Sequence, residues 1–163
     1  MDNINISQLD LSKNDISIQI KDNKKDKKMD VFIGYHFDNP KLKRLFEIKV
    51  KQLVESDLLR NYRPVMDSRL KLNITVMENI LDQISKSRMA IIDLTNHRHN
   101  VYFEAGILFG KNIPVIFTAH ESEKDNIPFD IDSYHIFYWN DDIELKEEEF
   151  LRNIRNCILL ELD

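Results

Sequence analysis

Apolar and polar positions follow two periodic patterns along this chain. Short, continuous apolar runs cover residues 30–34, 62–66, 89–94, 113–117 and 136–139, and such runs are typical of strands that are buried on both faces. The stretches between them carry apolar residues at helical spacing, as in Leu42, Leu45 and Phe46. Strands that alternate with helices predict a parallel sheet with helices on both of its faces.

The ends of the expected helices are marked by capping residues. Asn39 precedes Pro40, a proline at the first helical position, and Thr75 with Glu78 forms the spacing of a capping box. We expect Asn100 to cap a helix over residues 101–109 that Gly110 ends, and a last helix over residues 146–160. These elements predict an α/β fold, a flavodoxin-like three-layer sandwich with a five-stranded parallel sheet in the order 2-1-3-4-5.

The first 28 residues follow a different pattern. Isoleucines and leucines alternate there with polar residues, and a charged run over residues 22–28 follows. The segment is either a disordered leader or an arm that adds strands to a partner or to a second copy of the chain. The regular alternation favours the arm, so we expect an N-terminal arm and linker over residues 1–28, a domain over residues 29–163, and a homo-oligomer that forms through the arm.

Composition narrows the classes of function. The 163 residues carry a net charge of −5, which argues against nucleic acid as a partner. No apolar run is long enough to cross a membrane or to act as a signal peptide, so we expect a cytoplasmic protein without a membrane partner. The single cysteine, Cys157, and the close pair His97 and His99 do not provide a metal site, so we expect no metal. With three glycines and no phosphate-binding loop, ATP hydrolysis and NAD redox chemistry are poor candidates, and we expect no cofactor.

Ligands of open α/β sheets bind beyond the carboxyl ends of the strands, and this rule selects the candidate site. We expect Glu104 as the catalytic carboxylate and the following residues as substrate contacts: Gly34, Tyr35, His36, Asp67, Arg69, Asp93, Thr95, Arg98 and Asn100. Glu104 and Asp93 should converge there. Glu104 should lie in the first turn of its helix, where the helix dipole favours a carboxylate in either a structural or a functional role.

The other side chains have two interpretations each. Tyr35 either stacks on a base or closes the end of the sheet, and Gly34 allows a sugar or phosphate to approach the backbone. Arg98 or His36 is a candidate contact for a phosphate or for the leaving base. Asp67 and Arg69 form either substrate contacts or an exposed ion pair in a loop.

Several segments of the chain resemble known families. Residues 30–35 (DVFIGY) are similar to the opening strand of TIR domains. Residues 87–95 (SRMAIIDLT), 100–106 (NVYFEAG) and 110–116 (GKNIPVI) resemble the central block of the nucleoside 2-deoxyribosyltransferase-like family, and 127–130 (IPFD) with 134–138 is similar to a tail of its bacterial members. The resemblance covers residues 30–139. The residues just before Glu104 depart from both families, which leaves the substrate open.

The resemblance implies a chemistry for Glu104. In deoxyribosyltransferases the corresponding glutamate attacks C1′ of the sugar, and in TIR-type enzymes it supports cleavage of the nicotinamide–ribose bond of NAD. The resemblance therefore implies an enzyme that cleaves the N-glycosidic bond of a nucleoside, a nucleotide or NAD, as a hydrolase or a transferase, with Asp93 and Asn100 holding the substrate. The alternative is a TIR-like nucleotide-sensing or assembly module in bacterial antiphage immunity.

Overall fold

A computed structural model describes residues 28–66, 75–141 and 143–160. Five strands form one parallel sheet in the order β2-β1-β3-β4-β5. The strands are β1 (Met29–Gly34), β2 (Tyr62–Met66), β3 (Ser87–Asp93), β4 (Val115–His120) and β5 (Ile136–Trp139). The predicted α/β class, strand number and strand order are confirmed. The expected N-terminal arm, up to residue 27, lies outside the described residues.

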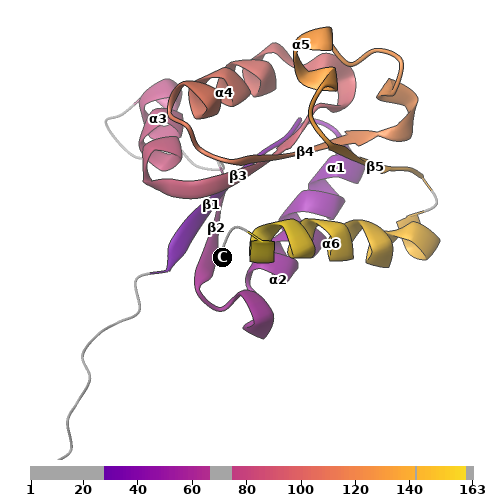
Figure 1. Ribbon diagram of the computed structural model, residues 1–163, viewed down its shortest axis with the longest axis horizontal. Coiled ribbons are helices and arrows are strands. Elements are labelled where there is room, and N and C mark those ends of the chain that lie inside the picture. The colour runs from indigo at the N-terminus through magenta and orange to yellow at the C-terminus, as the bar shows by residue number, and fades with distance from the viewer. Residues whose placement is uncertain (1–27, 67–74, 142, 161–163) are drawn as a thin grey trace, which may run out of the picture.

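Helices cover both faces of the sheet (Figure 1). One face carries α1 (Pro40–Arg44), α2 (Lys51–Val54) and α6 (Ile143–Leu160), and the π-helical segment η2 (Leu45–Val50) joins α1 to α2. The other face carries α3 (Val76–Lys86), α4 (His99–Gly110) and α5 (Phe129–Asp132). Short 3₁₀ turns follow three of these elements: η3 (Asp57–Leu59), η4 (Thr95–His97) and η5 (Glu121–Glu123). No helix among the described residues is both long enough and apolar enough to cross a bilayer.

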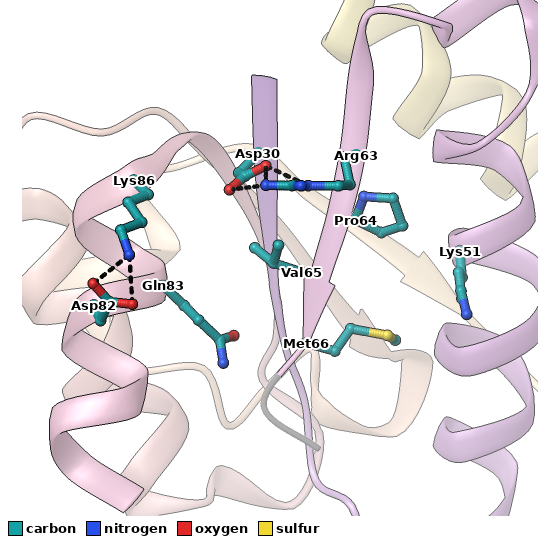
Figure 2. A pocket seen from close by; sticks show the side chains of 9 residues that line it. All are labelled: Asp30, Lys51, Arg63, Pro64, Val65, Met66, Asp82, Gln83 and Lys86. Carbon is teal, nitrogen blue, oxygen red and sulfur yellow. Dashed lines mark hydrogen bonds and ion pairs between the residues drawn. The ribbon is translucent and has the colours of Figure 1, made fainter. Parts of the chain in front are cut away.

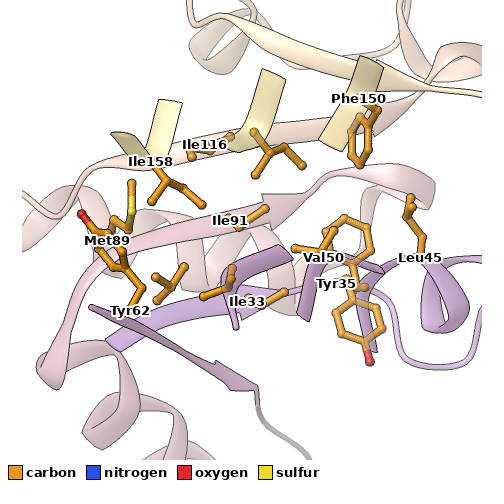
Figure 3. Close-up of a cluster of buried hydrophobic side chains, with 14 of the residues drawn as sticks. Ile33, Tyr35, Leu45, Val50, Tyr62, Met89, Ile91, Ile116, Phe150 and Ile158 are labelled. Atoms are coloured by element: carbon orange, nitrogen blue, oxygen red, sulfur yellow. The ribbon is translucent and has the colours of Figure 1, made fainter. Parts of the chain in front are cut away.

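Each face of the sheet has its own apolar core. Alternate residues of a strand point to opposite faces, so Ile33 and Ile91 pack beneath α6 and α1, in the cluster drawn in Figure 3. Their neighbours Phe32 and Ile92 pack beneath α3 and α4. This parity decides which polar side chains at the strand ends share a face.

Two of the three predicted helix caps are confirmed. The Asn39 side chain accepts hydrogen bonds from the N–H groups of Lys41 and Leu42, and Thr75 and Glu78 form the reciprocal capping box. The prediction for Asn100 is wrong: α4 begins at His99, and no side-chain hydrogen bond caps it at Arg98. Asn100 therefore lies exposed within the first turn.

In the described part of the chain, β2 forms one edge of the sheet, and Pro64 lies in its middle. The Met29 N–H donates to the Asn61 carbonyl, and backbone groups alternate in direction along a parallel strand, so residues 61, 63 and 65 face β1. Pro64 then faces outward, where its missing N–H removes no hydrogen bond from the sheet.

Candidate functional site

Glu104 is buried at the carboxyl end of β1, although it is charged at neutral pH in water. Only 3% of its surface is exposed. Its Oε2 atom lies 2.5 Å from the point where a Cβ atom would stand on Gly34, and Ile92 Cδ1 and Phe32 Cε1 lie 2.8 and 3.3 Å from the same point. The carboxylate therefore lies directly against the Gly34 backbone, beside two apolar side chains.

This contact gives Gly34 a role that the sequence analysis did not predict. We expected the bare backbone to admit a sugar or a phosphate, but the Glu104 carboxylate fills that space. Gly34 pairs in register with Ile92, so its open side faces the layer of α3 and α4. A Cβ atom at position 34 would force the Glu104 carboxylate and the Ile92 side chain to shift.

The expected position of Glu104, in the first turn of its helix, is wrong. Because α4 begins at His99, Glu104 is its sixth residue, and the first turn contains no acidic residue. The field of a helix end falls off within the first turn. The helix dipole therefore explains little of how Glu104 is held.

Asp93 does not converge with Glu104. It is fully buried on the opposite face of the sheet, with Trp139. Its Oδ1 accepts from the Thr95 N–H at 3.1 Å, and its Oδ2 accepts from Thr118 Oγ1 at 2.8 Å and from Trp139 Nε1 at 2.9 Å. Burial raises the pKa of Asp93, and these hydrogen bonds oppose the rise. The geometry assigns Asp93 to holding the ends of β3, β4 and β5 together and not to contact with a ligand.

Thr95 and Tyr35 are also structural in this arrangement. Thr95 is 4% exposed, and its Oγ1 accepts from the His120 N–H at 2.9 Å. The Tyr35 ring is buried in the core beneath α1, stacked on Phe46, and its hydroxyl donates to Glu47 Oε1 at 2.7 Å. Burial first, and then Glu47, raises the pKa of Tyr35. Tyr35 presents no open face to a base.

His36 and Arg98 meet at the rim of the strand ends. Asn96 Nδ2 donates to His36 Nδ1 at 3.3 Å, and Asp38 lies 3.6 Å from His36 Nε2 and 3.5 Å from Arg98 Nη2. Arg98 is 46% exposed and Asp38 is 86% exposed, so this ion pair is screened by solvent. Arg98 is therefore accessible to an anionic ligand.

The loop between β3 and α4 is strained and is held from two sides. Asn96 and His97 have positive φ angles of 63° and 47°, which cost non-glycine residues on the order of 1–3 kcal/mol each. His97 Nε2 lies 2.8 Å from Glu123 Oε2, and His97 Nδ1 lies 2.8 Å from the Tyr102 hydroxyl. Backbone strain at the carboxyl edge of a sheet is characteristic of functional loops.

Sequence reasoning missed Glu123 and Trp139. Both lie many residues from their partners in the chain, 26 in the pair of Glu123 with His97 and 46 in the pair of Trp139 with Asp93. Strand parity places Gly34 on the face of Phe32 and Asp93 on the face of Ile91. These faces are opposite because Gly34 pairs in register with Ile92, and the sequence alone does not supply that register.

Asp67 and Arg69 lie outside the described residues, so the structure does not test their expected role.

A groove of about 430 Å³ runs along the outer side of β2, between α2 and α3, lined by Lys51, Val65 and Gln83 among others (Figure 2). Its lining includes none of the residues expected in the site.

Within the part of the chain that the structure describes, no group of three or more metal-ligating side chains forms a metal site. No family model matches the sequence, and no curated protein matches it at a significant level. The site has a buried carboxylate against a glycine at the end of β1, and exposed arginine and asparagine side chains with a histidine at the same edge of the sheet.

Proposed function

We propose that this protein cleaves the N-glycosidic bond of a nucleoside, a nucleotide or NAD, with Glu104 as the reacting carboxylate. The observation that carries the proposal is the burial of this side chain against Gly34 at the carboxyl end of β1. A carboxylate in a site with little water interacts strongly with a developing positive charge. The resemblance of residues 87–116 to the deoxyribosyltransferase-like block supports the same assignment.

The reaction needs a carboxylate at the anomeric carbon. Glu104 either forms a bond to C1′ or stabilises the oxocarbenium ion, while the C1′–N bond breaks and its electron pair leaves with the base. Nicotinamide leaves NAD as a neutral molecule, whereas the base of a nucleoside takes up a proton from solvent. Water or a second base then attacks C1′, loses a proton and releases the Glu104 carboxylate. Arg98, at the rim and 46% exposed, is the candidate contact for a substrate phosphate.

A nucleotide-sensing module is the second candidate. Only 3% of the Glu104 surface is exposed, so a ligand must first open a path to the carboxylate. This requirement for a conformational change favours a sensor. A sensor would bind its ligand and change conformation without any turnover.

The test is a substrate panel with chromatography for free base. NAD, nucleoside monophosphates and deoxynucleosides are incubated with the unmodified chain, with Glu104→Gln and with Glu148→Gln, whose side chain is exposed on α6. We expect base release from the unmodified chain and from Glu148→Gln, and a rate at least about 100-fold lower from Glu104→Gln. Release that persists in Glu104→Gln contradicts the proposal, and saturable binding without any release favours the sensor.

A further inference from the structure

Three side chains from separate segments form a continuous hydrogen-bonded chain near the start of α4. Glu123 lies in η5 after β4, His97 lies in η4 after β3, and Tyr102 is the fourth residue of α4. Both ring nitrogens of His97 are engaged, Nε2 with Glu123 Oε2 and Nδ1 with the Tyr102 hydroxyl, each at 2.8 Å. A carboxylate accepts only, so Nε2 carries a proton, and in the neutral imidazole Nδ1 accepts from the Tyr102 hydroxyl.

The chain is partly shielded from water. Side-chain exposure is 34% for His97 and 12% for Glu123, and Tyr102 is half-buried against the core beneath α4. Burial and the nearby Glu123 charge raise the pKa of Tyr102, so its hydroxyl keeps its proton at neutral pH. Glu123 Oε1 also lies 3.4 Å from the Asn96 N–H, so one carboxylate contacts both residues of the left-handed pair.

The position of this chain couples it to the candidate site. Arg98 supplies no side-chain cap to α4, so the contact of Tyr102 with His97 adds a side-chain anchor to the backbone hydrogen bonds that the Val101 and Tyr102 N–H groups donate to the Arg98 carbonyl. Tyr102 lies two residues before Glu104, and the Glu104 carboxylate fills a gap that is too small for a Cβ atom. A small rotation of this turn would move the carboxylate out of that gap.

We propose that His97 is a positioning residue, which links Glu123 to Tyr102 and so holds the first turns of α4, and with them Glu104, in place. The proposal rests on the proposed function for its kinetic consequence only. It also explains why the loop tolerates two left-handed residues in succession, since the conformation directs the His97 ring toward both partners.

Amide hydrogen exchange of residues 101–104 tests the anchoring directly. We expect faster exchange in His97→Gly and in Tyr102→Phe, and the double variant should exchange no faster than either single one because both break the same chain. Glu123→Gln keeps an acceptor and should behave like the unmodified chain, whereas Glu123→Ala should not. Tyr134→Phe, which removes a hydroxyl from an exposed tyrosine, is the matched control.

The same variants distinguish an anchoring role of the His97 side chain from an effect of the strained His97 backbone. If His97 matters only through its positive φ, glycine relieves the strain, and His97→Gly exchanges at the original rate or more slowly. That result overturns the proposal. With a substrate identified by the panel, kcat should fall on the order of tenfold in His97→Gly while KM stays within about twofold. If the panel yields no substrate, the proposed function fails, and the exchange rates still decide the anchoring.

Discussion

At the carboxyl end of β1, the Glu104 carboxylate occupies the space where any other residue at position 34 would carry its Cβ atom. Sequence reasoning selected both residues but assigned them separate tasks, Gly34 to substrate contact and Glu104 to catalysis. The close approach joins them, because buried side chains pack without free volume. The contact explains the glycine without a bound ligand, and it makes position 34 the most direct means of displacing Glu104.

Replacement of Gly34 by alanine should therefore disturb the site. The added Cβ would lie 2.5 Å from Glu104 Oε2 and 2.8 Å from Ile92 Cδ1, so at least one of them must shift. We expect Gly34→Ala to lower the free energy of unfolding by about 1–3 kcal/mol, measured by urea denaturation, and to abolish base release.

Gly106→Ala provides the matched control for this substitution. Nothing lies within 4 Å of a Cβ atom added at Gly106, which is exposed within α4. Alanine there should stabilise the protein by about 0.5–1 kcal/mol. If Gly34→Ala is as stable as the unmodified chain and fully active, Glu104 does not depend on the gap.

At the scale of elements, Asp93 joins the carboxyl ends of three adjacent strands. One carboxylate accepts from its own loop, from Thr118 of β4 and from Trp139 of β5. The sequence analysis placed Asp93 at the correct edge of the sheet, but its convergence with Glu104 was wrong, because the register between β1 and β3 puts Gly34 and Asp93 on opposite faces. The hydrogen bonds oppose the cost of burial, and the net pKa of Asp93 is still raised.

This raised pKa gives a pH dependence with a definite sign. Between its ordinary value of 3.8 and the raised pKa, the folded chain binds the Asp93 proton and the unfolded chain does not. The free energy of unfolding therefore falls as the pH rises through this window. An asparagine at position 93 does not titrate, so the stability of Asp93→Asn lacks this pH dependence. We therefore expect the variant to be destabilised, relative to the unmodified chain, more strongly below this pH window than above it.

Urea denaturation at a series of pH values, followed by the fluorescence of Trp139, measures this difference. Trp139 is the only tryptophan, and its indole N–H donates to Asp93, so its emission should also titrate with the carboxyl group. A loss of stability that grows as the pH rises would show that the Asp93 pKa is lowered instead.

At the scale of the whole molecule, the described sheet has an edge at β2 whose outer side borders the groove between α2 and α3 (Figure 2). The outward-facing Pro64 removes a hydrogen-bond donor from this edge. Open edges pair readily with other strands, and natural proteins limit such pairing with proline or with charged residues. Pro64 therefore acts against association through β2.

Pro64→Val should increase association of the chain. It restores an N–H on the outer side of β2 and adds a residue that favours strands. We expect larger species in size-exclusion chromatography with light scattering, and faster aggregation on heating. Pro64→Lys restores the same N–H but adds a charge that disfavours pairing, so it should resemble the unmodified chain. Equal behaviour of the valine and lysine variants would exclude the edge as the cause.

The sequence by itself determined the elements, the strand order and the edge at which polar residues gather. These features follow from local periodicity, from caps such as Asn39 and from the general rules of parallel sheets. The tertiary structure alone decided which side chains meet there: Glu104 against Gly34, Asp93 with Trp139, and His97 between Glu123 and Tyr102. Such pairs depend on the face each strand residue takes and on the rotation of each helix. The face of each strand residue and the rotation of each helix are fixed only when the two cores pack. The local sequence leaves several helix rotations and strand registers nearly equal in energy, and packing selects one of them.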